Sequence, residues 1–301
     1  MDETFVIGEP ETVATRTVGE WRRFFKILFQ RKLVMVSVFL LVCFLVVALF
    51  APLIATHDPM KNDMKNVLQS PSAEHLAGTD NLGRDVFSRL VYGARTALII
   101  GFGTVALSSI IGVLLGILAG FLGGWVNAII MRVMDALMGF PMLVLALLLA
   151  AVLGAGMLNI IIALGVTTIP GYCRLMCAAT LSVKENEYIM AQRAIGAKSL
   201  RTMVKHVLPN AIQPIMVLVT TMLGTVILAE AGLSFLGVGI KAGEPAWGGM
   251  AAAGFRYLIG TPPHPGLSFV PSICIAVVVF SFNMLGDGLR DALDPRLRGK
   301  L

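Results

Sequence analysis

Charged residues are scarce in this chain, and their scarcity excludes most soluble folds. Only 14% of the 301 residues are Asp, Glu, Lys or Arg, whereas soluble domains carry about 25%. The few charges are unevenly spread, because long uncharged runs separate short polar segments. With 56% hydrophobic residues and a mean hydropathy of +0.82, the composition is that of a chain embedded in a bilayer.

Motifs for nucleotide binding and for common hydrolytic chemistry are also missing. There is no G-x-x-x-x-G-K-[ST] phosphate loop, so the chain is not expected to be an ATPase itself. Neither H-E-x-x-H nor G-x-S-x-G occurs, which removes the main support for a zinc protease or a hydrolase. No obvious internal repeat marks a self-sufficient secondary transporter. We therefore predict no enzyme, no catalytic residue and no cofactor in this chain.

Cysteine and histidine are few, and their positions do not predict a metal site. All four cysteines lie in apolar segments, so no disulfide framework is expected: Cys43, Cys173, Cys177 and Cys274. Cys173 and Cys177 share a helix face, but without a nearby His or carboxylate core packing is the preferred interpretation. The four histidines are scattered over loops expected on opposite sides of the membrane: His57, His75, His206 and His264.

The long apolar runs predict an all-α membrane protein with six transmembrane helices. The expected spans are residues 33–54, 96–122, 126–153, 159–179, 211–238 and 267–285. No small-residue cleavage site follows the first run, so it is expected to remain as an uncleaved anchor. Pro141, Pro170 and Pro271 lie within spans, where packed neighbours or water can satisfy the freed backbone groups.

The distribution of Lys and Arg predicts the orientation of these spans. Basic residues gather before the first span, between the fourth and fifth spans, and in the tail. An even number of spans places these three regions together, in the cytoplasm, with both termini. The expected division is a cytoplasmic segment 1–32, a first span and outer loop 33–95, a core 96–289 with a cytoplasmic loop 180–210, and a tail 290–301. Within the first segment, residues 18–29 are expected to form an interfacial amphipathic helix, with a basic flank that only sets the topology as the alternative.

The polar segment 187–210 is the most informative part of the chain. Gly196 and the pair Leu208–Pro209 predict a helix, a hinge, a second helix and a stop. A short helix of this kind can lie in a groove of a soluble protein, while Leu200, Met203 and Val204 seat the second helix against the bundle. An ordinary amphipathic loop between two spans is the alternative.

From Met190 onward, this segment resembles the cytoplasmic signature of binding-protein-dependent ABC transporter permeases. That signature has Glu-Ala-Ala, then a Gly four residues after the second Ala, and a Leu-Pro about a dozen residues later. Ala191 and Gly196 match, as do Leu208 and Pro209. The first and third positions differ, being Met190 and Gln192, and Glu187 offers a carboxylate one turn earlier.

Two further blocks narrow the resemblance to the dipeptide, oligopeptide and nickel group, and within it to the C-type permease subunit. Residues 75–98, HLAGTDNLGRDVFSRLVYGARTAL, resemble the block before the second span in that group. Residues 283–296, NMLGDGLRDALDPR, resemble its ending, and AGLSFLGVG at 231–239 and PAWG at 245–248 extend the likeness. The motifs occur in the correct order over nearly the whole chain.

The resemblance implies a type I ABC importer permease fold in the bacterial inner membrane. It also implies a homologous second permease, two cytoplasmic ATPases that bind ATP and Mg²⁺, and an extracytoplasmic binding protein. The expected cargo is a dipeptide or oligopeptide, with nickel, a metal chelate or glutathione as alternatives. A stand-alone channel or secondary carrier is the alternative from another class. The residues expected to couple to the ATPases are Glu187, Ala191, Gln192, Gly196, Leu208 and Pro209.

Ionisable residues within spans are candidates for function, because an unpaired charge there is costly. Arg132 and Asp135 are three residues apart on one helix face and are expected to pair, while Arg174 can snorkel toward the cytoplasm. Glu230 is the only charge in the fifth span, so it is expected either to face the translocation path or to pair with Arg95 or Arg256. Before the second span, charges are expected to form a salt-bridged cap rather than a substrate contact: Asp80, Arg84, Asp85, Arg89 and Arg95.

Overall fold

A computed structural model describes residues 25, 27–259 and 263–293. Within these residues the fold is all helical, without a strand, as predicted. Most of the proposed amphipathic helix at 18–29 and of the tail at 290–301 lies outside the described residues.

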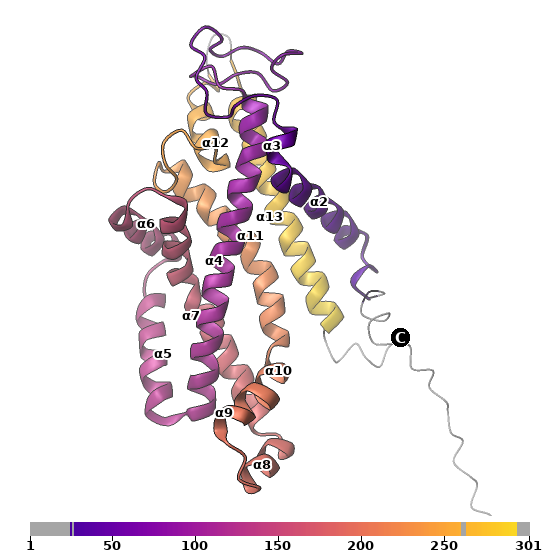
Figure 1. Ribbon diagram of the computed structural model, residues 1–301, viewed down its shortest axis with the longest axis vertical. Coiled ribbons are helices and arrows are strands. Elements are labelled where there is room, and N and C mark those ends of the chain that lie inside the picture. Colours follow the sequence, from indigo (N-terminus) through magenta and orange to yellow (C-terminus); the bar gives the residue numbers. More distant parts are fainter. Residues whose placement is uncertain (1–24, 26, 260–262, 294–301) are drawn as a thin grey trace, which may run out of the picture.

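In the described part of the chain, five helices are long and apolar enough to cross a membrane: α2 (Lys32–Leu49), α4 (Val86–Leu122), α7 (Met157–Lys184), α11 (Gln213–Phe235) and α13 (Gly266–Leu293). They run roughly side by side in Figure 1. The helix α4 begins ten residues before the expected span. At 1.5 Å per residue, its 37 residues extend over roughly 55 Å, well beyond a hydrocarbon core of about 30 Å. The first turns of α4 therefore stand outside the membrane.

The third expected span is not one continuous helix. It is divided into α5 (Gly124–Met138) and α6 (Met142–Leu153), which meet at 90°. Pro141 explains the break, because it lacks an N–H and disfavours helical backbone at the preceding Phe140. The prediction of six spans holds only if this bent pair counts as one. The first run is also interrupted, at Phe50, after which the short α3 (Ala51–Ile54) begins.

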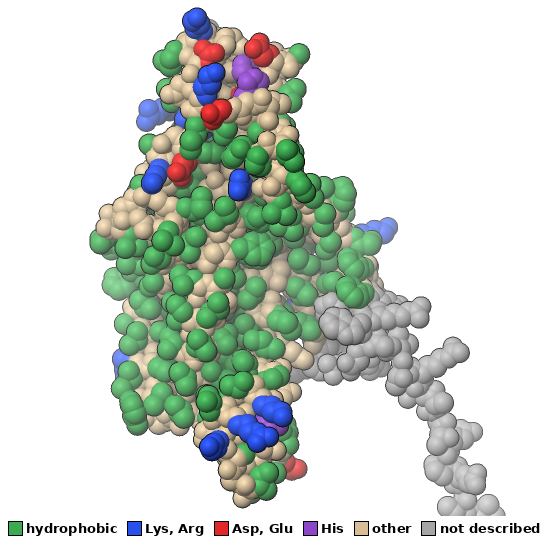
Figure 2. Space-filling model, in the orientation of Figure 1, with side chains coloured by type: hydrophobic (Ala, Val, Ile, Leu, Met, Phe, Trp, Pro, Cys, Tyr) green, Lys and Arg blue, Asp and Glu red, His purple; other side chains and the backbone are tan. Residues whose placement is uncertain are grey.

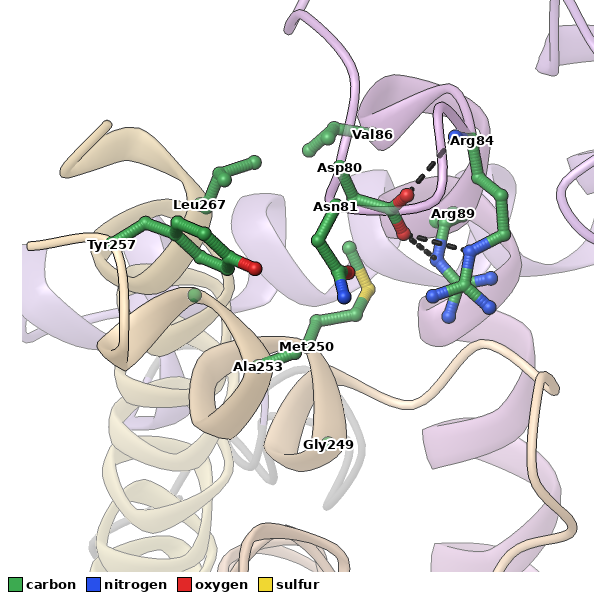
Figure 3. A pocket seen from close by; sticks show the side chains of 11 residues that line it. Asp80, Asn81, Arg84, Val86, Arg89, Gly249, Met250, Ala253, Tyr257 and Leu267 are labelled. Carbon is green, nitrogen blue, oxygen red and sulfur yellow. Dashed lines mark hydrogen bonds and ion pairs between the residues drawn. The ribbon is translucent and has the colours of Figure 1, made fainter. Parts of the chain in front are cut away.

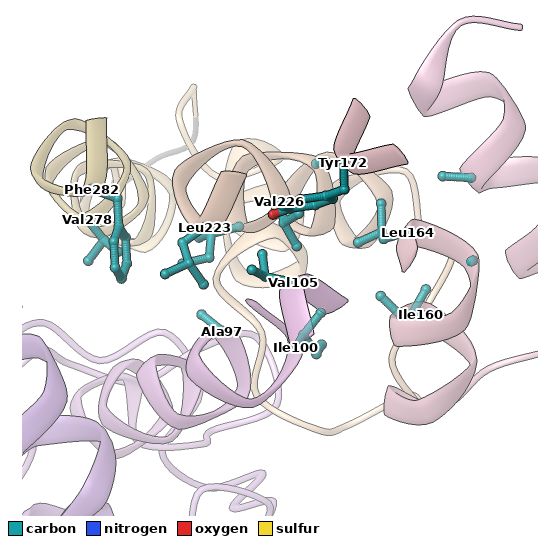
Figure 4. Packing of buried hydrophobic residues seen from close by; sticks show 14 of the residues in the cluster. Ala97, Ile100, Val105, Ile160, Leu164, Tyr172, Leu223, Val226, Val278 and Phe282 are labelled. Atoms are coloured by element: carbon teal, nitrogen blue, oxygen red, sulfur yellow. The ribbon is translucent and has the colours of Figure 1, made fainter. Parts of the chain in front are cut away.

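The core fills the space between α4, α7, α11 and α13. Figure 4 shows Ile100, Tyr172 and Leu223 converging from three of these helices, with Phe282 beside them from α13. The most extensive contact is between α4 and α7, where three glycines of α4 let the two backbones approach. A Cβ on Gly116 would lie 2.5 Å from the carbonyl oxygen of Cys173. Gly112 and Gly120, one turn away on either side, are equally tight against α7.

The outer surface has the polarity of a membrane protein. Figure 2 shows hydrophobic side chains over the middle of one face and most of the charged side chains toward its two ends. At one end lie α8 (Glu187–Ala194), α9 (Ser199–Thr202), the π-helix η1 (Met203–Val207) and α10 (Leu208–Ala211). At the other end lie the loop before α4 and the short helix α12 (Trp247–Phe255).

Candidate functional site

The helix α8 projects from the end of the bundle, beyond the last turn of α7 (Figure 1). It starts at Asn186, whose carbonyl oxygen accepts the amides of Ile189 at 3.0 Å and Met190 at 3.3 Å. Glu187 lies exposed in the first turn, where a carboxylate interacts favourably with the helix dipole. Glu187 therefore has a local role in starting the helix, in addition to the polar contact that the sequence suggests.

Gly196 ends this helix, as the sequence predicts. Its φ is +77°, and the amide of Ala197 donates to the carbonyl of Gln192 at 3.0 Å. This is the hydrogen bond of a Schellman C-cap, which favours glycine because other residues rarely adopt this φ. No atom lies within 4 Å of where a Cβ would stand, so the backbone conformation, not space, requires glycine here.

The apolar residues of α8 and α9 are divided between one anchor and an open surface. Ile189 is fully buried against the bundle, whereas Met190 is 53% and Ile195 is 77% exposed. Leu200 and Val204 are also exposed, so the prediction that they seat the second helix against the bundle is wrong. Only Met203 of that trio is buried, because α9 has four residues and the chain then enters a π-turn. This arrangement leaves an apolar surface outside the membrane-spanning part of the chain, which we call the α8 surface: Tyr188, Met190, Ile195, Leu200 and Val204.

The expected stop at Leu208–Pro209 is also wrong. The chain stays helical through Pro209 to Ala211 and breaks at Ile212, just before Pro214 in the first turn of α11. The π-turn accounts for this, because the amide of Leu208 donates to Met203, five residues back. A widened turn makes room for the Pro209 ring, which would clash in a regular α-helix. Pro209 is exposed and Leu208 is half-buried.

Basic side chains surround the α8 surface. Lys198, Arg201 and Lys205 are exposed in this segment, and blue side chains gather at this end of the molecule in Figure 2. Lys184 instead turns inward, where its Nζ donates to the carbonyl oxygen of Phe121 at 2.8 Å and caps the end of α4. The segment therefore combines an apolar surface with a cationic border.

The opposite end of the bundle holds a cavity of about 690 Å³. It lies between the end of α11, the loop that follows and α12. Trp247 fixes α12 in place, because its indole N–H donates to the carbonyl oxygen of Leu90 on α4 at 2.9 Å. The charged lining is four bases and one acid: Arg84, Arg89, Lys241, Arg256 and Glu244. The balance of charge favours an anionic group in this cavity.

Glu230 is buried below this cavity. Its side chain is 2% exposed, and Oε1 accepts a hydrogen bond from the hydroxyl of Ser234 at 2.7 Å. Ser234 lines the cavity one turn above, so it separates Glu230 from the cavity. Among the described residues Glu230 has no ion pair with Arg95 or Arg256, and that alternative is wrong. A role in the translocation path stays a prediction.

An ion-paired cap stands beside the cavity, as expected for the block before the second span. Nε of Arg84 lies 2.7 Å from Oδ2 of Asp80, and Nε of Arg89 lies 3.6 Å from the same oxygen (Figure 3). Arg89 also donates to the carbonyl oxygens of Pro59 and Gly243, which ties the loop before α4 to the loop between α11 and α12. The predicted cap is confirmed for these three charges.

The other two charges expected in the cap lie elsewhere. Asp85 bonds His75 instead of an arginine, and its other oxygen accepts the amide of Ser88 at the start of α4. Arg95 is exposed and belongs to no ion pair in the described part of the chain.

Comparison with known proteins decides the family. Residues 112–299 match the binding-protein-dependent transport system inner membrane component family. The chain belongs to this family. Residues 19–71 also match the N-terminal transmembrane domain of oligopeptide transport permease C. The protein is thus a multi-pass permease subunit of an ABC importer, as the resemblance of its motifs implies.

Relatives of this permease are similar over almost their whole length. The dipeptide transport system permease protein DppC of Alkalihalophilus pseudofirmus is 41% identical over 93% of this chain and 91% of its own. The oligopeptide permease OppC of Bacillus subtilis is 38% identical, and the glutathione permease GsiD of Escherichia coli is 39% identical, each over 97% of this chain and 94% of the relative. The inward-facing MetNI methionine ABC transporter shares the fold, with a TM-score of 0.55 and 20% identity over 68% of this chain and 97% of that one.

One ion pair in the permease differs from the prediction. Asp135 pairs with Arg174 of α7, not with Arg132 on its own helix. The helix α5 lies against α7. Asp135 therefore meets Arg174, thirty-nine residues later in the sequence, instead of Arg132, which is three residues away on its own helix. Arg174 therefore links two helices instead of snorkelling alone.

The permease brings its predicted coupling residues together only in part. Glu187, Ala191, Gln192 and Gly196 share one short helix and its cap, with Ala191 exposed and Gln192 half-buried. Leu208 and Pro209 belong to the re-entry into the bundle, and Glu230 lies toward the opposite end. The basic lining of the cavity was not identified from the sequence, although Lys241 and Arg256 are charges in a loop otherwise poor in them.

Proposed function

We propose that this permease imports dipeptides or oligopeptides across the bacterial inner membrane and is coupled through α8 to cytoplasmic ATPases. In this proposal a homologous second permease completes the translocation path, and an extracytoplasmic binding protein delivers the cargo. ATP and Mg²⁺ are bound and used by the ATPases, and this chain carries no cofactor.

The α8 surface is the observation that carries the coupling role. Tyr188, Met190 and Ile195 are exposed on a helix that projects beyond the bundle, where lipid does not cover them. Apolar residues exposed to water in this way mark a protein contact, and a short helix seated in a groove is a common mode of recognition. The buried Ile189 ties this helix to the core, so a movement of the ATPases would be transmitted to the bundle.

The cavity at the other end supports a peptide as cargo. Lys241 and Arg256, which form no ion pair in the described part of the chain, can receive the carboxylate of a peptide terminus, since Arg and Lys donate charge-assisted hydrogen bonds to carboxylates. Relatives named for dipeptide, oligopeptide and glutathione transport all carry cargo of this chemistry. We therefore expect Lys241→Gln combined with Arg256→Gln to raise the KM for a free dipeptide more than for its C-terminal amide.

Replacement of Gly196 by Asp tests the coupling role. We expect this variant, and Ala191→Glu, to abolish ATP-dependent uptake while the chain still inserts, because each alters the shape of the α8 surface. Gly123→Asp is a matched control, since Gly123 also has a positive φ and open space around it but lies in the turn between α4 and α5. Wild-type uptake by the Gly196→Asp variant would contradict the assignment.

Competition for uptake tests the cargo. In a strain that lacks the native gene, labelled dipeptide uptake restored by this permease is measured against excess unlabelled oligopeptide, glutathione and Ni²⁺. Competition by peptides alone supports the proposal. Competition by Ni²⁺ alone would assign the permease to metal import, and a preference for glutathione would assign it to the cargo named for GsiD.

A further inference from the structure

Two imidazoles and a carboxylate from three parts of the chain meet at the end opposite α8. His57 follows α3, His75 lies in the long loop, and Asp85 is the N-cap residue of α4. Nδ1 of His75 lies 2.9 Å from Oδ1 of Asp85, and Nδ1 of His57 lies 3.9 Å from the same oxygen. The prediction that the histidines lie scattered is therefore wrong for this pair.

Each of the three residues is held by its own hydrogen bonds. The backbone amide of His57 donates to the hydroxyl of Ser88 at 2.9 Å. The backbone amide of His75 donates to the hydroxyl of Ser72 at 3.0 Å, and the carbonyl of His75 accepts the amides of Ser72 and Gly78. Asp85 uses its second oxygen to accept the amide of Ser88 at 2.7 Å. The cluster is thus preformed by the surrounding backbone.

The spacing of these atoms is close to that of metal ligands. One nitrogen or oxygen from each residue lies within 4.8 Å of the other two. Tetrahedral zinc with bonds of about 2.0–2.1 Å needs ligand atoms about 3.3 Å apart. The separations from Asp85 Oδ1 are 2.9 and 3.9 Å, one slightly shorter and one slightly longer than this. Shifts of roughly 0.4–0.6 Å would bring both separations to the zinc spacing, and the ligand nitrogens of the two rings, which lie within 4.8 Å of each other, would also approach one another around an ion.

The hydrogen bond between His75 and Asp85 does not explain why the imidazole of His57 also lies beside them. The ring of His57 lies with its centroid 4.7 Å from that of His75, tilted by 36°. Nδ1 of His57 lies 3.0 Å from the hydroxyl of Thr56. An ion can replace this contact, because the same hydroxyl also lies 3.4 Å from Oγ of Ser88 and so keeps a partner. His57 is part-exposed, whereas His75 and Asp85 are buried. An ion could therefore approach from the side of His57.

We propose that His57, His75 and Asp85 form a resident binding site for a divalent transition metal of the zinc class. Two imidazoles and a carboxylate suit Zn²⁺, with water in the fourth position, and suit Ca²⁺ or Mg²⁺ poorly. The ion would join the end of α3, the loop and the start of α4. It is a structural ion and not cargo, because two of its three ligands are buried and one of them caps a helix. This site is independent of the proposed transport function.

Cobalt titration tests the site. The full-length chain, with the subunits that copurify with it, is placed in lipid nanodiscs and titrated with Co²⁺, whose visible absorption is strong only in four-coordinate sites. We expect one such Co²⁺ per permease chain, displaced by Zn²⁺. His57→Gln should weaken binding by more than the roughly 10–100-fold that loss of an outer partner costs. Zn²⁺ should raise the thermal unfolding midpoint of the wild type and not that of this variant.

The controls separate a metal site from a folding defect. His57 is part-exposed, so His57→Gln should keep the unfolding midpoint of the metal-free wild type. His264→Gln removes another histidine from the same end of the molecule and should bind Co²⁺ as the wild type does. Equal Co²⁺ binding by the wild type and His57→Gln would overturn the proposal. So would the absence of four-coordinate Co²⁺ in the wild type, which would leave His75 and Asp85 as a hydrogen-bonded pair.

Discussion

At the scale of residues, the sequence predicts backbone conformation better than it predicts partners. Gly196 is needed for its positive φ, a local property that the sequence alone indicates. The partner of Asp135 is not local, since Arg174 comes from a helix that the sequence does not place beside α5. The same holds for His57 and His75, which are eighteen positions apart and meet only because the loop folds back on α4. Contacts of this kind depend on the packing of distant segments.

The glycines of α4 show that a single residue can set the distance between two packed helices. Gly116 has the carbonyl oxygen of Cys173 2.5 Å from the position of a Cβ, so any side chain would push α4 and α7 apart. We expect Gly116→Leu to lower the free energy of unfolding by about 1–3 kcal/mol or more, the usual cost of overpacking. Unfolding in mixed detergent measures this change. Gly171→Leu is the control, since Gly171 has open space at its Cβ and should change stability much less. Equal losses in both variants would contradict the packing argument.

At the scale of elements, the apolar runs predicted the helices well and their interruptions poorly. The starts of α2, α7 and α13 lie within two residues of the starts of the expected spans, whereas their ends differ from the expected ends by five to eight residues. Hydropathy finds such helices because the bilayer sets the length of an apolar helix. The prolines were harder to interpret. Pro141 bends its span by 90°, whereas Pro170 lies inside α7 and Pro209 continues a helix after a π-turn. The outcome depends on whether neighbouring groups satisfy the freed backbone, which the sequence does not show.

Two isoleucines of the α8 region allow two roles to be tested separately: the attachment of α8 to the bundle and the docking of the α8 surface to an ATPase. Ile189 is buried in the core and Ile195 is 77% exposed. We expect Ile189→Ala to loosen α8, because it removes the anchor, and to increase amide hydrogen exchange there by at least tenfold. Ile195→Ala should leave exchange in the isolated permease unchanged and instead weaken copurification of ATPase subunits. If Ile189→Ala left exchange in α8 unchanged, the anchoring role would be wrong. If Ile195→Ala retained the ATPases fully, the α8 surface would not be the docking site.

At the scale of the whole molecule, composition predicted a membrane protein with polar ends, and the structure agrees (Figure 2). Composition could not predict that the basic cavity and the α8 surface lie at opposite ends of the bundle, because this depends on how the spans pack. Between these two regions the space among α4, α7, α11 and α13 is filled by side chains such as Ile100, Tyr172 and Leu223 (Figure 4). Cargo therefore cannot pass through the middle of this bundle as it stands. In the proposed assembly, a path along the surface of this bundle, against a second permease, would join the two regions.

This arrangement predicts that the chain does not transport alone. Purified full-length permease in proteoliposomes is expected to show no uptake of labelled dipeptide, with or without ATP, because one packed bundle offers no continuous path. Uptake should appear when the second permease, the ATPases and the binding protein are reconstituted with it. Gly196→Asp in the complete assembly should be as inactive as the chain alone, since it loses coupling while all the subunits are supplied. Saturable flux through the chain alone would favour a stand-alone carrier, and unsaturable flux a channel; either result would require a path within this single bundle.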